Sequence, residues 1–210
     1  MRVLVFGDSI AQGFFDVEGG WVNYLRKYYD EILIRNNDIS QPTVFNLAIS
    51  GDFTRSVLKR FEDEVTARVW PGEEFVFIFA VGTNDTVYRG QEYESEPDIY
   101  KNELSELLNI AKKYSKEIMF VGLYPIIDRL LQPAPFSETG KSYSTERMHL
   151  FDKTLNNFCK KNKVAYVDLW REFTKQDNLE TVFFDGIHPN DKGHKLIYEI
   201  VQPKLEELLK

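Results

Sequence analysis

The sequence predicts an α/β protein in which a parallel sheet is covered by helices on both faces. Short runs rich in β-branched and aromatic residues alternate with longer amphipathic segments, and the alternation occurs five times. The run EFVFIFAVG at 74–82 is the most apolar of the chain, as expected of a strand buried on both faces. Such alternation gives parallel strands joined by right-handed helical crossovers.

Five strands and five helices are expected, one helix after each strand. The strands are short apolar runs rich in β-branched and aromatic residues, at 2–7, 43–48, 74–82, 117–123 and 164–169. The helices are the longer segments with charged residues among apolar ones, at 18–30, 54–69, 97–115, about 145–161 and about 191–209.

Two stretches show no regular pattern and are expected to be irregular, at 85–97 and 124–144. The second is long for a connection without secondary structure, which is typical of a lid or a binding loop. Its segment IIDRLL at 126–131 could form a short helix.

Length and charge restrict the class of protein. At 210 residues the chain is expected to form one domain, residues 1–210. A net charge of -7 argues against binding to nucleic acid or to anionic membranes, which require a basic patch. The apolar run at the N-terminus is too short for a signal peptide, and no stretch approaches a membrane span, so we expect a cytoplasmic protein. The single cysteine, Cys159, is expected to pack inside a helix.

Polar residues follow the expected strands where each strand ends. GDS at 7–9 follows the first strand, NLAISGD at 46–52 the second, and GTND at 82–85 the third. FFDGIHPND at 183–191 follows the fifth strand at some distance. Because ligands bind at the carboxyl ends of the strands in open parallel sheets, these clusters predict one shared site.

The residue types in these clusters suit acyl transfer, which needs a nucleophile, a base, a group that orients the base and donors for an oxyanion. Ser9 is the candidate nucleophile and His188 the candidate base, with Asp185 three residues earlier to orient the imidazole. The candidate oxyanion donors are the backbone N–H groups of Ser9 and Gly51 and the side-chain amide of Asn84. No G-x-S-x-G elbow is present, so the usual α/β-hydrolase arrangement is not expected.

Other residues of these segments have plainer expected roles. Asp8, Asp52 and Asp85 are expected to cap helices or satisfy loop backbone, and His149 and His194 to pack or lie on the surface. Several aromatic residues could line a substrate pocket or belong to the core, and the sequence favours neither; they are Phe14, Phe15, Trp21, Phe53 and Tyr124.

The segments FGDSI, NLAISGD, VGTND and DGIHPN resemble blocks one, two, three and five of the SGNH hydrolases, also called GDSL-type esterases or lipases. All four occur in the expected order along nearly the whole chain. Two departures are small: Ile10 replaces the leucine of the GDSL motif, and Ala48 stands where the second block often has glycine.

The resemblance implies a three-layer α/β/α sandwich of the flavodoxin-like type with five parallel strands. It also implies hydrolysis of an ester or thioester through an acyl-serine, with no metal or organic cofactor. Residue by residue, it implies a triad of Ser9, Asp185 and His188 and an oxyanion hole of Ser9, Gly51 and Asn84. The substrate would be a small-molecule, lipid or carbohydrate ester.

Two other classes stay open at this point. A metal-dependent phosphoesterase also ends its strands with Asp, Asn and His, but two-metal sites usually use more than one histidine, and only His188 is well placed. A non-catalytic binding module on a flavodoxin-like scaffold is the second, because fold alone does not fix function. No G-x-G-x-x-G loop supports nucleotide binding.

Overall fold

The computed structural model describes all 210 residues and contains the five-stranded parallel sheet that the sequence predicts. The strand order is β2-β1-β3-β6-β7, and every neighbouring pair is parallel. This is the order of the flavodoxin-like doubly wound fold. The strands are β1 (Arg2–Gly7), β2 (Thr43–Asn46), β3 (Phe75–Ala80), β6 (Glu117–Val121) and β7 (Ala165–Val167).

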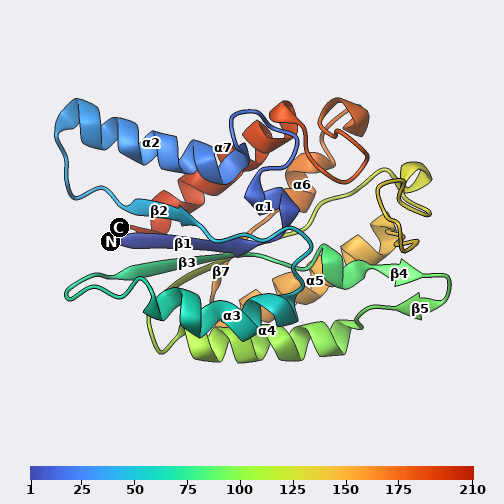
Figure 1. Cartoon of the computed structure of the whole chain (residues 1–210), viewed down its shortest axis with the longest axis horizontal. Helices are drawn as coiled ribbons and strands as arrows, with labels where there is room; N and C mark the ends of the chain where they lie inside the picture. Colours follow the sequence, from blue (N-terminus) through green and yellow to red (C-terminus); the bar gives the residue numbers. More distant parts are fainter.

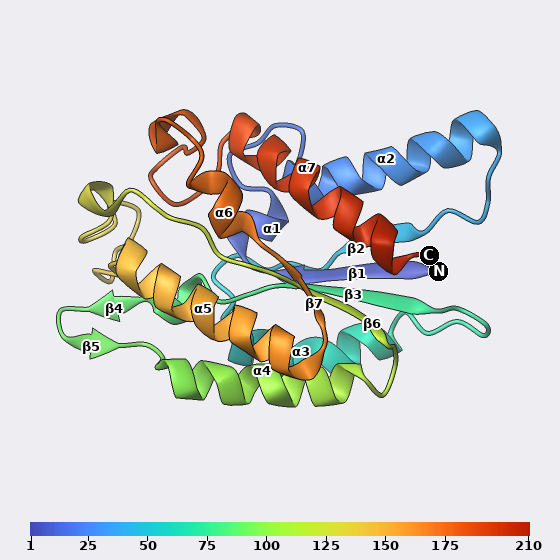
Figure 2. The same ribbon diagram turned by 180° about the vertical axis from the view of Figure 1, so that it is seen from behind.

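Helices cover both faces of the sheet, so the expected three layers are confirmed (Figure 1). One face carries α2 (Gly20–Asn36) and α7 (Asp191–Leu208), as the view from behind also shows (Figure 2). The other face carries α3 (Thr54–Thr66), α4 (Pro97–Ala111) and α5 (Thr145–Asn162). Two short helices, α1 (Ser9–Gln12) and α6 (Leu169–Phe173), follow β1 and β7 directly.

The central strand β3 is buried on both faces, as its apolar run predicts. On one face, Phe77 and Phe79 pack against Phe61 of α3, with ring centroids 5.1 and 5.7 Å away. Phe6 of the neighbouring strand β1 joins this cluster at 5.1 Å from Phe61. Burying these large rings supplies much of the hydrophobic driving force that holds the sheet rigid beneath its loops.

Helix α2 and the stretch 85–97 differ from the sequence-based expectation. Helix α2 begins at Gly20 rather than at 18, because Gly19 and Gly20 have positive φ, and it continues to Asn36 because no helix-breaking residue precedes Asn37. A hairpin of β4 (Tyr88–Arg89) and β5 (Glu92–Tyr93) forms within the stretch expected to be irregular.

The long connection 124–144 is anchored to this hairpin. The N–H of Tyr88 donates to the carbonyl of Ser142 at 3.1 Å, and the N–H of Ser142 donates back to Tyr88 at 2.8 Å. Its only helical part is a 3₁₀ turn at Asp128–Leu130, within the segment where a short helix was expected.

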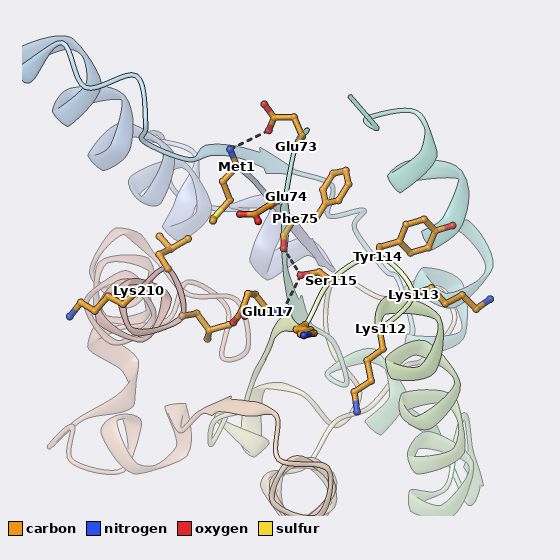
Figure 3. Close-up of a pocket in the computed structure, with 13 residues that line it drawn as sticks. Met1, Glu73, Glu74, Phe75, Lys112, Lys113, Tyr114, Ser115, Glu117 and Lys210 are labelled. Carbon is orange, nitrogen blue, oxygen red and sulfur yellow. Dashed lines mark hydrogen bonds and ion pairs between the residues drawn. The ribbon is translucent and has the colours of Figure 1, made fainter. Parts of the chain in front are cut away.

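The two ends of the sheet differ in chemistry. At the amino-terminal end, near both chain termini, a hollow of about 630 Å³ is lined by charged side chains, and the amino group of Met1 lies 3.2 Å from Glu73 (Figure 3). The polar clusters singled out in the sequence lie at the opposite, carboxyl end. None of the helices is both long and apolar enough to span a lipid bilayer.

Candidate active site

The nucleophile candidate begins a short helix directly after strand β1. Ser9 is the first residue of α1, and Asp8 caps that helix by accepting the N–H of Ile10 at 2.9 Å. The turn between β1 and α1 is so tight that position 7 has no room for a side chain. A Cβ added to Gly7 would lie 2.6 Å from the Cβ of Ala11. β1 therefore delivers the serine directly to the carboxyl edge of the sheet.

The base candidate reaches the same edge from the other end of the chain. His188 lies in the segment before α7, whose first turn is capped by Asn190. Its Nε2 is 2.9 Å from the Oγ of Ser9, and its Nδ1 is 2.7 Å from the Oδ2 of Asp185. Because an ionised carboxylate only accepts, Nδ1 carries the proton and the Ser9 hydroxyl donates to Nε2.

Asp185 is held in place by its own turn. Its Oδ1 accepts the backbone N–H groups of Ile187 at 3.1 Å and His188 at 2.9 Å. Burial raises the pKa of this carboxyl, but the hydrogen bond and charge of His188 and the two backbone donors outweigh burial and hold the pKa below its usual value. Asp185 therefore stays anionic and orients the imidazole.

The three expected oxyanion donors lie at this edge, and they differ in whether they already have a hydrogen-bond acceptor within the protein. The N–H groups of Ser9 and Gly51 have no acceptor within the protein and are free to donate to a substrate. Gly51 adopts a φ of +84°, a conformation that residues with a Cβ rarely take. The amide of Asn84 donates to the carbonyl of Asp52 at 3.0 Å and lies 3.4 Å from the Oδ2 of Asp8.

Hydrogen bonds to Asp85 and from Arg60 hold the loop that carries Gly51. The buried carboxyl of Asp85 accepts both the N–H and the hydroxyl of Thr54 at 3.1 Å, which confirms its expected role at the start of α3. Arg60 donates twice to the carboxylate of Asp52, at 2.7 and 3.0 Å. Asp52 therefore anchors the loop through an ion pair and not through a helix cap.

Asp8 is a buried carboxyl close to His188. Burial raises its pKa to about 6, against lowering contributions from the Ile10 N–H and from His188. Asp8 is therefore a second carboxyl near His188, in addition to Asp185.

Four exposed phenylalanines form a rim around His188, here called the phenylalanine rim. Ring centroids lie 5.3 Å from the imidazole for Phe15 and Phe136 and 6.3 Å for Phe14. Phe184 stacks on Phe15 with centroids 4.0 Å apart. Phe14 and Phe15 are among the pocket candidates expected from the sequence, whereas Phe136 and Phe184 are not, although Phe184 directly precedes Asp185.

The other aromatic candidates are elsewhere. Tyr124 is only 2% exposed, and its hydroxyl donates to the carbonyl of Ile187 at 3.1 Å, so it supports the His188 segment from inside. Trp21 is buried in the core. Phe53 lies under the guanidinium of Arg55, 4.1 Å from the ring centroid, and is not part of the rim. Of the two roles that the sequence left open for Tyr124, pocket or core, its burial supports the core.

The remaining histidines pack, as expected. His194 of α7 is buried and its Nε2–H donates to the carbonyl of Phe14 at 2.8 Å, which ties the loop before α2 to α7. His149 stacks on Trp170. No three His, Cys, Asp or Glu side chains come together in an arrangement that could hold a metal ion.

The family model and the relatives that this chain matches all point to one protein family. Residues 5–196 match the model of the GDSL-like Lipase/Acylhydrolase family. The chain is 24% identical over 214 aligned residues to the GDSL esterase/lipase WDL1 of Oryza sativa subsp. japonica, covering 97% of this chain and 77% of that protein. It is 27% identical to a GDSL esterase/lipase of Arabidopsis thaliana, covering 98% of this chain and 86% of that protein.

Solved structures share the fold. The lipase/acylhydrolase from Enterococcus faecalis superposes with a TM-score of 0.74 at 18% identity, over 98% of this chain and 95% of that one. The acetylxylan esterase Axe2 from Geobacillus stearothermophilus gives 0.73 at 18% identity, over 97% and 93%. With the family match over most of its length, the chain belongs to the GDSL-like lipase/acylhydrolase family of carboxylic ester hydrolases.

Proposed function

We propose that the protein hydrolyses carboxylic esters through an acyl-serine formed on Ser9. The observation that carries the proposal is the unbroken hydrogen-bonded chain from the Ser9 hydroxyl through His188 to Asp185. This arrangement allows the imidazole to take the serine proton as the oxygen attacks the acyl carbon.

Each step then uses a group of this chain. The C=O oxygen becomes an oxyanion held by the Ser9 and Gly51 N–H groups and by Asn84. As the bond to the alcohol oxygen breaks, protonated His188 gives that oxygen its proton, and the alcohol leaves. Water, deprotonated by His188, then attacks the acyl-serine. As the bond between the acyl carbon and the Ser9 Oγ breaks, His188 returns the proton to Ser9, and the acid leaves.

Covalent trapping tests the proposal directly. A fluorophosphonate probe should label the wild-type protein once, with the adduct on Ser9, and hydrolysis of p-nitrophenyl acetate should stop in parallel. Ser9→Ala should show neither label nor turnover. Ser105→Ala, which removes a hydroxyl on α4 that bonds only to Lys101, should behave as the wild type. Labelling of another residue, or full turnover by Ser9→Ala, would contradict the mechanism.

A further inference from the structure

The phenylalanine rim is an apolar surface that the hydrolytic steps themselves do not use. Its members are between 39% and 64% exposed, Phe14 being the least and Phe184 the most exposed. They come from separate segments, the loop after α1, the connection 124–144 and the segment before α7. Exposed apolar side chains that gather from distant segments around a catalytic group mark a binding surface.

Phe15 holds its place at a conformational cost. Its φ is +64°, in the left-handed region that a residue with a Cβ rarely occupies. The hydrogen bond from His194 to the neighbouring Phe14 carbonyl holds this loop in place. The strained backbone puts the Phe15 ring flat against Phe184, at an interplanar angle of 9°, so the two rings make one stacked unit beside the imidazole. Backbone strain of this kind is concentrated at functional sites.

The position of His188 decides which part of an ester meets this surface. The imidazole must come within hydrogen-bond reach of the leaving oxygen to protonate it, so the alcohol portion departs on its side. Two of the three oxyanion donors, Gly51 and Asn84, belong to other loops than the rim, while the third, the Ser9 N–H, lies at the start of α1. A rim that surrounds the imidazole therefore contacts the alcohol and not the carbonyl oxygen.

We propose that the phenylalanine rim is the subsite for the alcohol portion of the ester. It selects esters whose alcohol portion contains a ring with an apolar face. This rests on the proposed function. All four side chains are uncharged, and stacked aromatic rings favour flat partners, either an aryl ring or the C–H face of a sugar. The name of the structurally similar acetylxylan esterase points to the sugar source.

Acetate esters that differ only in the alcohol test the subsite. Ethyl acetate, benzyl acetate and a mono-acetylated methyl xyloside are compared on the wild type, Phe184→Ala and Phe15→Gly; glycine keeps the positive φ. In Phe184→Ala and Phe15→Gly, we expect kcat/KM to fall roughly tenfold relative to the wild type for each ring-bearing ester that the subsite accepts. For ethyl acetate, kcat/KM should stay within about twofold of the wild-type value. Ile34→Ala, which removes an exposed side chain of α2, is the matched control.

Comparison of the losses for benzyl acetate and for the acetylated xyloside shows whether the subsite accepts an aryl ring or a sugar ring. Equal losses for all three acetates, or no loss for either ring-bearing ester, would overturn the proposal. A loss that instead follows acyl length, between ethyl butyrate and ethyl octanoate, would assign the rim to the acyl chain.

Binding without turnover separates the subsite from the proposed function. Ligand-observed NMR should detect benzyl acetate or the acetylated xyloside bound to Ser9→Ala, and binding should weaken in Ser9→Ala/Phe184→Ala. If the wild type hydrolyses no ester while this binding depends on Phe184, the proposed function fails and the subsite stands. Binding that does not depend on Phe184 overturns the subsite whatever the turnover.

Discussion

The Oγ of Ser9 lies 2.9 Å from the Nε2 of His188, although 179 residues separate them in the sequence. The sheet makes this contact possible, because β1 delivers Ser9 to its carboxyl edge and the segment before α7 returns His188 to the same edge. Tyr124 supports that segment through its bond to Ile187. The hydroxyl and imidazole are thus aligned for proton transfer before any substrate binds.

Asp185→Asn should lower kcat by roughly 10² to 10⁴-fold, and by less than the loss of Ser9. The carboxylate accepts from the imidazole with one oxygen and from two backbone N–H groups with the other. An amide has a single acceptor oxygen, so one of these contacts must be lost or the imidazole must take the wrong tautomer.

Steady-state kinetics with p-nitrophenyl acetate measures the effect, and circular dichroism checks that Asp185→Asn is folded. Asp168→Asn, at the start of α6, is a matched control that changes a capping carboxyl away from the triad. Unchanged kcat in Asp185→Asn would remove Asp185 from the mechanism.

Asn84→Ala should lower kcat by about 10² to 10³-fold, the usual loss for an oxyanion donor. The amide also donates to the Asp52 carbonyl, so its removal could act by loosening the loop of Gly51. Arg60→Ala separates the two effects, because Arg60 holds the same loop through the Asp52 carboxylate without being an oxyanion donor.

If Asn84 is a donor, Arg60→Ala should retain far more activity than Asn84→Ala when both are assayed with the same ester. Equal losses of kcat would show that Asn84 acts by holding the loop. A change confined to KM would indicate binding of the ground state instead.

Much of the site can be predicted from local sequence, because each candidate catalytic residue lies within a few residues of a strand end or a helix start. The parallel alternation of strands and helices then places Ser9 and His188 at one edge. The surface around them does not follow in the same way. Tyr124 and Phe136 belong to the same connection, yet one is buried and the other exposed, because long-range hydrogen bonds to β4 and to Ile187 set the path of that connection. The position of Phe15 depends equally on a positive φ that no local pattern signals.

Gly51→Ala should impair catalysis through the backbone alone. An added Cβ would meet no atom within 4 Å, so the substitution is not sterically blocked, but the φ of +84° is unfavourable for alanine by roughly 1–2 kcal/mol. Relief of this strain would turn the free N–H away from the oxyanion, and kcat should fall by about tenfold or more.

Gly72→Ala provides the matched control, since Gly72 has a φ of +81° and equally open surroundings, in the turn before β3. Chemical denaturation should show similar destabilisation of the two variants, while only Gly51→Ala should lose activity. Full activity in a folded Gly51→Ala protein would mean that this N–H does not contribute.

Asp8→Asn should change how stability depends on pH. Burial raises the pKa of Asp8 in the folded protein from 3.8 to about 6, so the folded state keeps a proton that the unfolded chain releases as pH rises through this range. The wild type therefore loses stability between pH 4 and 6, and asparagine, which stays neutral and can still cap α1, does not. The free energy of unfolding of Asp8→Asn relative to wild type should rise with pH to a plateau of roughly 3 kcal/mol near pH 7.

Urea denaturation of the wild type and Asp8→Asn at a series of pH values measures this difference. Asp38→Asn is the opposite control, because hydrogen bonds from Ser40 and Gln41 lower the pKa of this exposed carboxyl in the folded state. Its contribution to stability is present at neutral pH and is lost as pH falls, so the relative stability of Asp38→Asn should decrease, not increase, with rising pH. Parallel stability curves for the wild type and Asp8→Asn would mean that Asp8 is ionised in the folded protein at no cost, and that burial does not govern its protonation.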